Sequence, residues 1–134
     1  MPGTAALNTG GGAYGNSVSC PSAGNCSAGG SYTKNTPGDP EEAFVVNEVN
    51  GTWHKAIEVP GTAALNRGGN ADITSVSCAS AGNCSAGGFY RDSSGHNQAF
   101  VVSQTGGTWH TAIEVPGTAA LNHSDARVLS LIHI

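Results

Sequence analysis

An internal repeat constrains this chain more than any other feature of its sequence. The stretch SVSCPSAGNCSAGG at 17–30 returns as SVSCASAGNCSAGG at 75–88, and PGTAALN begins at Pro2, Pro60 and Pro116. Self-similarity at a fixed period is typical of repeat architectures, in which neighbouring copies of one unit stack and bury a shared core. The repeat divides the chain into a first unit at 2–59, a second unit at 60–115, the start of a third repeat at 116–122, and a divergent tail at 123–134.

The two units differ in length at one place. Matching residues are 58 positions apart as far as Tyr32 and Tyr90, but 56 apart from Ala43 and Ala99 onward. Insertions are tolerated in loops and not in strand ladders. The region concerned, TKNTPGDPEE in one copy and RDSSGHNQ in the other, is polar and rich in turn residues. We therefore predict a loop there in each unit.

Each unit reads as a series of short strands, since the chain contains 20 glycines and few helix formers. The last strand alternates with a period of two, which predicts that the Trp109, Thr111, Ile113 and Val115 face is better buried than the His110, Ala112 and Glu114 face. The small residues CSAGG favour a strand packed closely between neighbouring sheets. In the second unit the four predicted strands are 73–79, 84–90, 98–103 and 108–115.

These features predict an all-β fold of tandem four-stranded antiparallel meanders. Asn50-Gly51 is a strong signal for a tight hairpin turn between the third and fourth strands. A periodic array of such meanders favours two blades of an incomplete β-propeller, with a solenoid as the alternative. Two blades cannot close a ring, so we expect further repeats of the same protein, in a longer parent chain or in an assembly of several chains.

The four cysteines form two pairs of equal spacing. Four cysteines permit three pairings, and the hairpin interpretation places Cys20 near Cys26 and Cys78 near Cys84, across one turn each. A disulfide ring that short stabilises by about 2 kcal/mol and implies an oxidising compartment, and hence a secreted protein. The alternative is a zinc site, but paired zinc ligands usually flank two to four residues rather than five. We therefore expect no metal and no cofactor.

Composition excludes several classes of partner. The formal net charge is −4, and no basic stripe is present that could neutralise phosphates, so nucleic acid is not expected as a partner. No apolar run approaches the length of a membrane span. The Gly-Gly pairs lack the Lys-Ser/Thr and the helix of a phosphate-binding loop.

No residue qualifies as a catalytic candidate. His54 and His110 recur in both units, as do Glu58 and Glu114, and a residue that recurs in every unit is more simply part of packing or surface. We expect the two glutamates to face solvent. His96 and His123 occur once each, without an evident partner. The carboxylates Asp39, Glu41, Glu42 and Asp92 gather in the variable loop, where glycoside hydrolysis would need two at a defined separation, but a solvated loop explains them more simply.

The repeated motif resembles secreted bacterial repeat proteins of an actinobacterial type. Their blades contain SVSC-x-S-x-x-x-C-x-A-x-G, matched at 17–30 and 75–88, and NG-x-x-W, matched at Asn50–Trp53 and, without the Asn, at Gly106–Trp109. The resemblance covers about 120 residues and implies a propeller-like fold and export, with no established activity. The turn before each tryptophan also partly resembles the sialidase Asp-box, a turn that stabilises a fold.

The two ends differ from the repeat. MPGTAALN equals VPGTAALN with Met in place of Val, which suggests an internal codon read as a start. Residues 129–134 resemble a translated sequencing adapter, the alternative being a divergent apolar strand. The sequence thus predicts a non-catalytic extracellular repeat module that binds a glycan, wall polymer or protein, or acts as a scaffold. The alternative is a fragment of a β-propeller carbohydrate hydrolase whose catalytic residues lie outside this chain.

Overall fold

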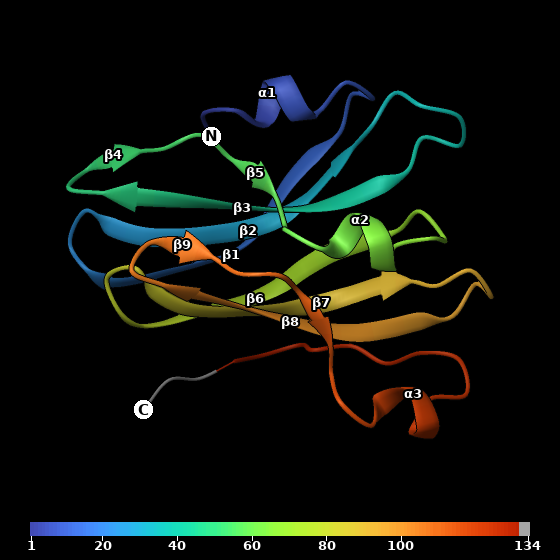
Figure 1. The fold of residues 1–134 in the computed structure, drawn as a ribbon. Helices are drawn as coiled ribbons and strands as arrows, with labels where there is room; N and C mark the ends of the chain where they lie inside the picture. The colour runs from blue at the N-terminus through green and yellow to red at the C-terminus, as the bar shows by residue number, and fades with distance from the viewer. Residues whose placement is uncertain (132–134) are drawn as a thin grey trace.

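The protein is an all-β molecule built from two antiparallel sheets that lie face to face (Figure 1). The structure is a computed structural model, and it describes residues 1–131. Each sheet has five strands and arises from one repeat. The first contains β1 (Ala13–Ser22), β2 (Asn25–Thr33), β3 (Glu41–Val49), β4 (Thr52–Trp53) and β5 (Ile57–Glu58). The second contains β6 (Ala71–Ser80), β7 (Asn83–Arg91), β8 (Asn97–Thr105), β9 (Thr108–Trp109) and β10 (Ile113–Glu114). The all-β prediction is thereby confirmed, and the two sheets do not close into a ring.

The fourth strand of each unit is broken, which corrects the prediction of one continuous strand over 108–115. Both pieces pair with the third strand, as β4 and β5 do with β3. Between the pieces, the N–H of Ala56 donates to Pro2 O at 2.9 Å, and that of Ala112 donates to Pro60 O at 2.8 Å. The backbone thus leaves the ladder because the preceding linker offers it a different acceptor.

The burial predicted for this strand holds before the break and fails after it. Trp109 is buried and His110 is exposed, as predicted, but Ala112 is 5% exposed and Ile113 is 54% exposed, the reverse of the expected pattern. A detour of the backbone between the two pieces resets the alternation of side chains, since that alternation holds only within a continuous strand.

The repeated GTAALN linkers form one helical turn each, a feature that the sequence did not predict. They are α1 (Thr4–Leu7), α2 (Thr62–Leu65) and α3 (Thr118–Leu121). Gly61 precedes α2 with φ +86°, a left-handed conformation that glycine adopts without a steric penalty. Each turn is held in the same way, for example by the Thr62 hydroxyl, which donates to Val59 O at 2.7 Å.

The linker asparagines tie each turn to the third strand of the unit before it. Asn66 Nδ2 donates to Glu41 O at 3.0 Å and to Glu42 Oε2 at 3.1 Å. Asn122 makes the corresponding bonds to the start of β8. The linker therefore fixes where each third strand begins as well as leading to the next sheet.

The main core lies between the two sheets. Val45 of β3 packs with Ile73 of β6 and with Phe100 and Val102 of β8 in one buried apolar cluster. Gly29 of β2 lies directly under Ile73, since a Cβ there would come within 2.6 Å of Ile73 Cγ2. The CSAGG strand is thus small because the neighbouring sheet approaches it closely, as the sequence predicts.

The outer face of the first sheet carries a second, smaller cluster. Its buried residues come from β2, β3 and the segment after β4, and they are Ala28, Tyr32, Phe44, Val46 and Ala56. The partly buried Leu7 of α1 and Trp53 of β4 pack against them. The outer face of the second sheet is covered by the described part of the tail, which runs along it on the side away from the first sheet (Figure 1). The part of the adapter interpretation that falls on 132–134 lies outside the described residues.

Candidate functional site

A polar cluster joins the two units at the end of the sheets where the disulfides lie. Asn47, which follows the repeated AFVV of β3, is its centre: its Oδ1 accepts from Gln104 Nε2 at 2.8 Å and from Trp109 Nε1 at 2.9 Å. Asn47 Nδ2 donates to Gly107 O at 3.2 Å. Because Asn47 belongs to the first unit and its three partners to the second, one side chain anchors the junction.

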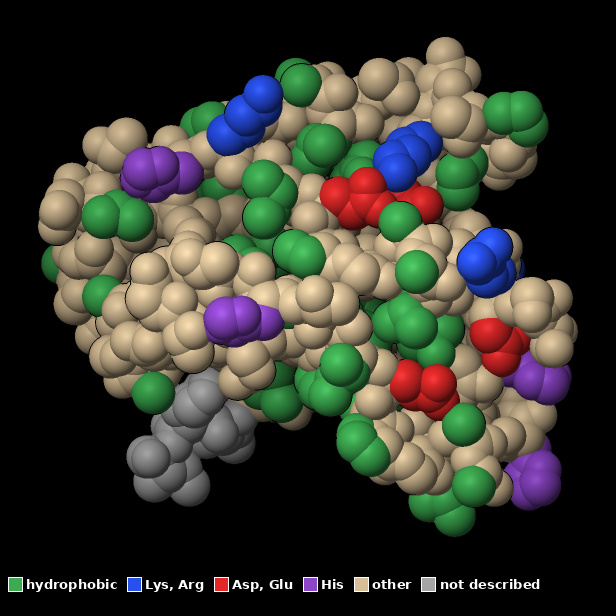
Figure 2. Space-filling model, viewed as in Figure 1, with side chains coloured by type: hydrophobic (Ala, Val, Ile, Leu, Met, Phe, Trp, Pro, Cys, Tyr) green, Lys and Arg blue, Asp and Glu red, His purple; other side chains and the backbone are tan. Residues whose placement is uncertain are grey.

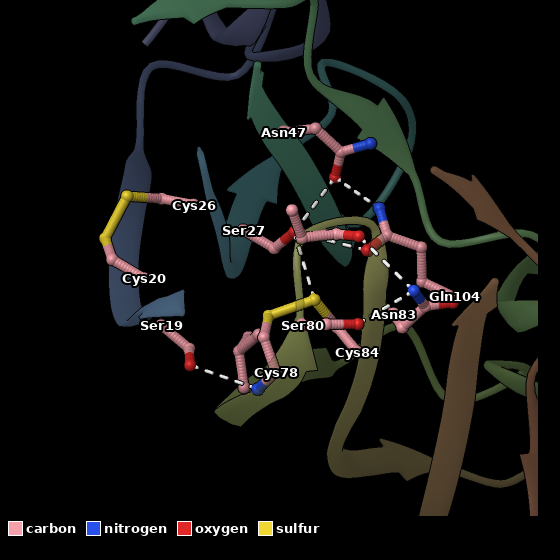
Figure 3. The surroundings of a disulfide bond; sticks show 12 residues. Ser19, Cys20, Cys26, Ser27, Asn47, Cys78, Ser80, Asn83, Cys84 and Gln104 are labelled. Atoms are coloured by element: carbon pink, nitrogen blue, oxygen red, sulfur yellow. Dashed lines mark hydrogen bonds between the residues drawn. A yellow bond between two sulfur atoms is a disulfide. The ribbon is translucent and has the colours of Figure 1, made fainter. Parts of the chain in front are cut away.

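Ser27 adds a hydroxyl to the same cluster. Its Oγ lies 3.2 Å from Asn47 Oδ1 and 3.4 Å from Gln104 Oε1, and it has one proton to share between them. The Sγ of Cys84 lies 3.4 Å from this hydroxyl. Figure 3 shows Asn47, Ser27 and Gln104 directed toward one another next to the Cys78–Cys84 disulfide. Buried amides and hydroxyls are thus paired across the junction, as burial away from water requires.

The disulfides join Cys20 to Cys26 and Cys78 to Cys84, the pairs expected from the hairpins. Cys78 and Cys84 are direct cross-strand partners in the β6–β7 ladder, with 3.9 Å between their Cα atoms. Each hairpin turn rests on the other turn of its unit, since the N–H of Gly51 donates to Gly24 O at 2.8 Å. In each unit, the turns at the disulfide end are therefore held together by a disulfide and a backbone hydrogen bond.

Two clefts flank Asn47 and Gly107. The first has a volume of about 240 Å³ and is lined by amides and backbone, among them Asn25, Gln104 and Gly82. The second, of about 280 Å³, lies between the broken fourth strand of the first unit and the β9 hairpin of the second. Its lining includes His54, Lys55, Ile57, Thr108 and Trp109.

The break in the fourth strand shapes the second cleft. His54 and Lys55 lie in the segment that leaves the ladder between β4 and β5, and both are exposed. Their counterparts His110 and Thr111 are exposed as well, but line neither of these clefts. Within residues 1–131, only the first unit is followed by another complete unit, so this recurring histidine lines an inter-unit cleft in the first unit alone.

Electrostatics leave these clefts close to neutral. Charged side chains are few on the face of the molecule in Figure 2. Glu48 is the one carboxylate lining the two clefts, and Lys55 is the one side chain there with a permanent positive charge. Glycoside hydrolysis uses two carboxyl groups flanking the scissile bond. The clefts therefore suit the binding of a neutral, hydrogen-bonding ligand.

Contrary to the prediction, the recurring glutamates do not face solvent. Glu58 and Glu114 are half-buried, and their Oε2 atoms accept from the hydroxyls of Tyr32 and Tyr90, at 3.1 Å in each case. Their Oε1 atoms are buried with no hydrogen-bond partner among residues 1–131. The cause is the break in the strand, which turns these side chains toward the tyrosines of the second strand in each unit.

Burial and the glutamate partners raise the pKa of both tyrosines. For Tyr90, burial is the larger cause and the hydrogen bond to Glu114 the next, and together they raise its pKa to about 12. The pKa of Tyr32 is raised by burial and by Glu58. Both hydroxyls are therefore protonated donors at neutral pH and act in packing.

The carboxylates of the variable loop are not one solvated group. Glu41 and Glu42 belong to β3, and Glu42 is buried, which raises its pKa; the hydrogen bond from Asn66 opposes this rise. Asp92 closes its own turn, accepting from the N–H groups of Ser94 and His96. Asp39 is exposed in the loop before β3. His123 is exposed at the start of the tail. The structure does not bring these residues together.

Comparisons with known proteins add no relative. No protein-family model matches the chain, and a search of curated proteins finds no match. Among residues 1–131, no helix is long and apolar enough to cross a membrane. No group of three or more His, Cys, Asp or Glu side chains in this range could hold a metal ion.

Sequence reasoning missed Asn47. It lies at a position where the repeats differ, since Ser103 follows AFVV in the second unit. A comparison of the two repeats draws attention to positions that hold the same residue in both. The contact between the units depends instead on a position at which the two repeats hold different residues. The Asn47/Ser103 difference, next to an otherwise identical AFVV, is the signal that could have identified it.

Proposed function

We propose that this chain is a non-catalytic repeat module of an exported protein that binds a neutral, polyhydroxylated ligand, a glycan, in the clefts beside Asn47. Small-molecule sites are concave, mostly apolar, and carry a few convergent polar groups. The inter-unit clefts combine amides, hydroxyls and exposed backbone with Val45, Ile57 and Trp109. Their sparsely charged, hydrogen-bonding lining at the junction of the two units is the observation that carries the proposal.

The stacking of the units supports the β-propeller interpretation within this proposal. Blades of a propeller are four-stranded antiparallel sheets arranged radially. Here β6 of the second unit packs across the face of the first sheet, and the short fourth strands lie at the opposite edge. Export is supported by the two disulfides, which persist in oxidising environments.

Binding can be tested on an array of neutral and charged oligosaccharides, followed by titration calorimetry on any positive. We expect neutral glycans to be retained, and His54→Ala and Lys55→Ala to weaken their binding. His110→Ala and Thr111→Ala are the matched controls, because they occupy the same repeat positions outside the two clefts. Equal losses in both pairs, or no retained neutral glycan, would contradict the proposal. Release of reducing sugar from the bound glycan would favour the hydrolase alternative.

A further inference from the structure

The junction between β1 and β6 has a simple pattern of contacts. Hydroxyls of the first unit accept backbone N–H groups of the second, from Val76 to Ser17 Oγ at 2.9 Å and from Cys78 to Ser19 Oγ at 3.1 Å. The Asn16 side chain donates to Ile73 O at 3.1 Å. Beside these bonds, Ile73 fills the space over Gly29. The junction is thus a row of side-chain-to-backbone hydrogen bonds next to the apolar core that the two sheets share.

The tail repeats these contacts on the outer face of the second sheet. The N–H of Leu131 donates to Ser75 Oγ at 2.9 Å, and the Thr74 hydroxyl donates to Val128 O. Val128 fills the space over Gly87, where a Cβ would come within 2.7 Å of its Cγ1. Isolated parallel bridges, Glu41 with Asn70 and Asn97 with Asp125, fix the same register. Residues 125–131 therefore take the place on the second sheet that 70–76 take on the first.

At the opposite end of the molecule, β1 presents a surface that corresponds to the surface of β6 in the internal junction. Val18 of β1 is 58% exposed, whereas its repeat counterpart Val76 is 6% exposed because it lies in the junction. Tyr14 and Met1 are exposed on the same strand and beside it. Two shallow pockets run along this surface, lined by Met1, Gly15 and their neighbours.

We propose that copies of this chain associate head to tail when residues 125–131 leave the outer face of the second sheet, with β1 of one copy docking there on another copy. The contact repeats the internal β1–β6 junction, so Ser75 of one copy accepts the N–H of Val18 of the next. A contact between two different surfaces is heterologous and generates a ring or an open chain of copies. The proposal uses the internal junction alone and is independent of glycan binding.

The tail and a second copy compete for this face. The tail is favoured by its covalent attachment, which makes its docking intramolecular. It also brings Val128, whereas β1 carries Gly15 where β6 carries Ile73. We therefore expect the unmodified chain to be mainly monomeric, and release of the tail to permit association.

Two substitutions favour docking of a second copy over docking of the tail. Val128→Asp releases the tail without emptying the core, since Val128 belongs to neither buried cluster. Gly15→Ile gives β1 the missing apolar side chain, and a Cβ at Gly15 meets only the flexible end of Met1, at 3.4 Å. Leu129→Asp is the matched control for the tail, because Leu129 is 72% exposed.

Sedimentation velocity over a wide concentration range, with circular dichroism to verify folding, tests the proposal. The G15I/V128D variant should show about a doubling or more of weight-average mass with rising concentration, as a heterologous contact requires. L129D should behave as the unmodified chain, and adding Val18→Asp should return G15I/V128D to monomer. A folded G15I/V128D that stays monomeric, or an association that V18D leaves unchanged, would overturn the proposal. If V128D does not fold, G15I alone serves, with concentration-dependent association expected and a strictly monomeric chain contradicting it.

Discussion

At the scale of single residues, the junction depends on a side chain that occurs in only one repeat. Asn47 supplies one oxygen to two donors of the second unit, Gln104 and Trp109. Both donors belong to buried residues, so neither can turn to water if that oxygen is lost. A buried donor left unsatisfied costs about 1–3 kcal/mol.

Asn47→Ala should therefore lower the free energy of unfolding by about 1–3 kcal/mol, since it leaves two buried N–H donors without an acceptor. Urea denaturation followed by tryptophan fluorescence measures this directly. Ser103→Ala is the control, because Ser103 takes the same repeat position in the second unit and is exposed; surface changes of this kind usually stay within about 0.5 kcal/mol. Similar losses for both variants would show that Asn47 has no special role.

A second residue-scale feature is an acid held at the junction. Burial and the nearby negative charge of Glu41 raise the pKa of Asp72 to about 6, although hydrogen bonds, the largest from Asn16, oppose the rise. The ordinary value in an unfolded chain is about 3.9. The folded protein therefore holds this proton more tightly than the unfolded chain does, and stability is lost as pH rises from about 4 to about 6.

Asp72→Asn should remove this dependence, because an amide can accept from Asn16 but does not ionise. The unfolding free energy of the variant minus that of the parent should grow as pH rises from about 4 to about 7. Urea titrations at several pH values over this range measure the difference. A difference that is constant with pH would contradict the assignment.

At the scale of elements, the linker turn depends on glycines that adopt a left-handed conformation. Gly61 and Gly117 have φ of +86° and +85°. They differ in their surroundings, since a Cβ at Gly61 would lie 2.6 Å from Thr111 Cγ2, whereas one at Gly117 would meet nothing within 4 Å. Gly61 and Gly117 thus share one backbone conformation, but an added Cβ would clash only at Gly61.

Gly117→Ala should cost about 1–2 kcal/mol of stability from backbone conformation alone. Gly61→Ala should cost clearly more, because the segment at Thr111 must also move away from the new methyl group. Equilibrium unfolding of the two variants side by side provides the measurement. Equal costs would mean that the contact between Gly61 and Thr111 contributes little.

The first three strands of each unit were predictable and the fourth was not. Alternating side chains, turn residues and the Asn50-Gly51 turn, with φ of 50° and 81°, depend on local conformation that the sequence reveals. The break at 54–56 and 110–112 depends on Pro2 O and Pro60 O, which are distant in sequence. The helical turn of TAAL was hidden for another reason, because a four-residue element is too short to show a period.

The candidate site was less predictable than the fold. The cysteine pairs follow from spacing, because each hairpin brings its own two residues together. The clefts cannot be predicted from spacing, because each is formed by residues from both units. Their placement depends on how the two sheets stack. Glu58 and Glu114 were assigned to solvent for the same reason, since their contacts with Tyr32 and Tyr90 follow from the broken strand.

At the scale of the whole molecule, the second sheet stacks on the first through β6, and the tail repeats this junction on the outer face of the second sheet. The amides of Val76 and Cys78 report on this stacking, because they donate to hydroxyls of the first unit. Their hydrogen exchange therefore measures the stacking of the units directly.

Amide hydrogen exchange followed by NMR is the decisive measurement. We expect the Val76 and Cys78 amides to be protected in the unmodified chain, and Ser17→Ala to accelerate exchange at Val76 while Ser75→Ala does not. Rapid exchange at both amides in the unmodified chain, or protection at Val76 that is indifferent to Ser17→Ala, would contradict the stacked arrangement.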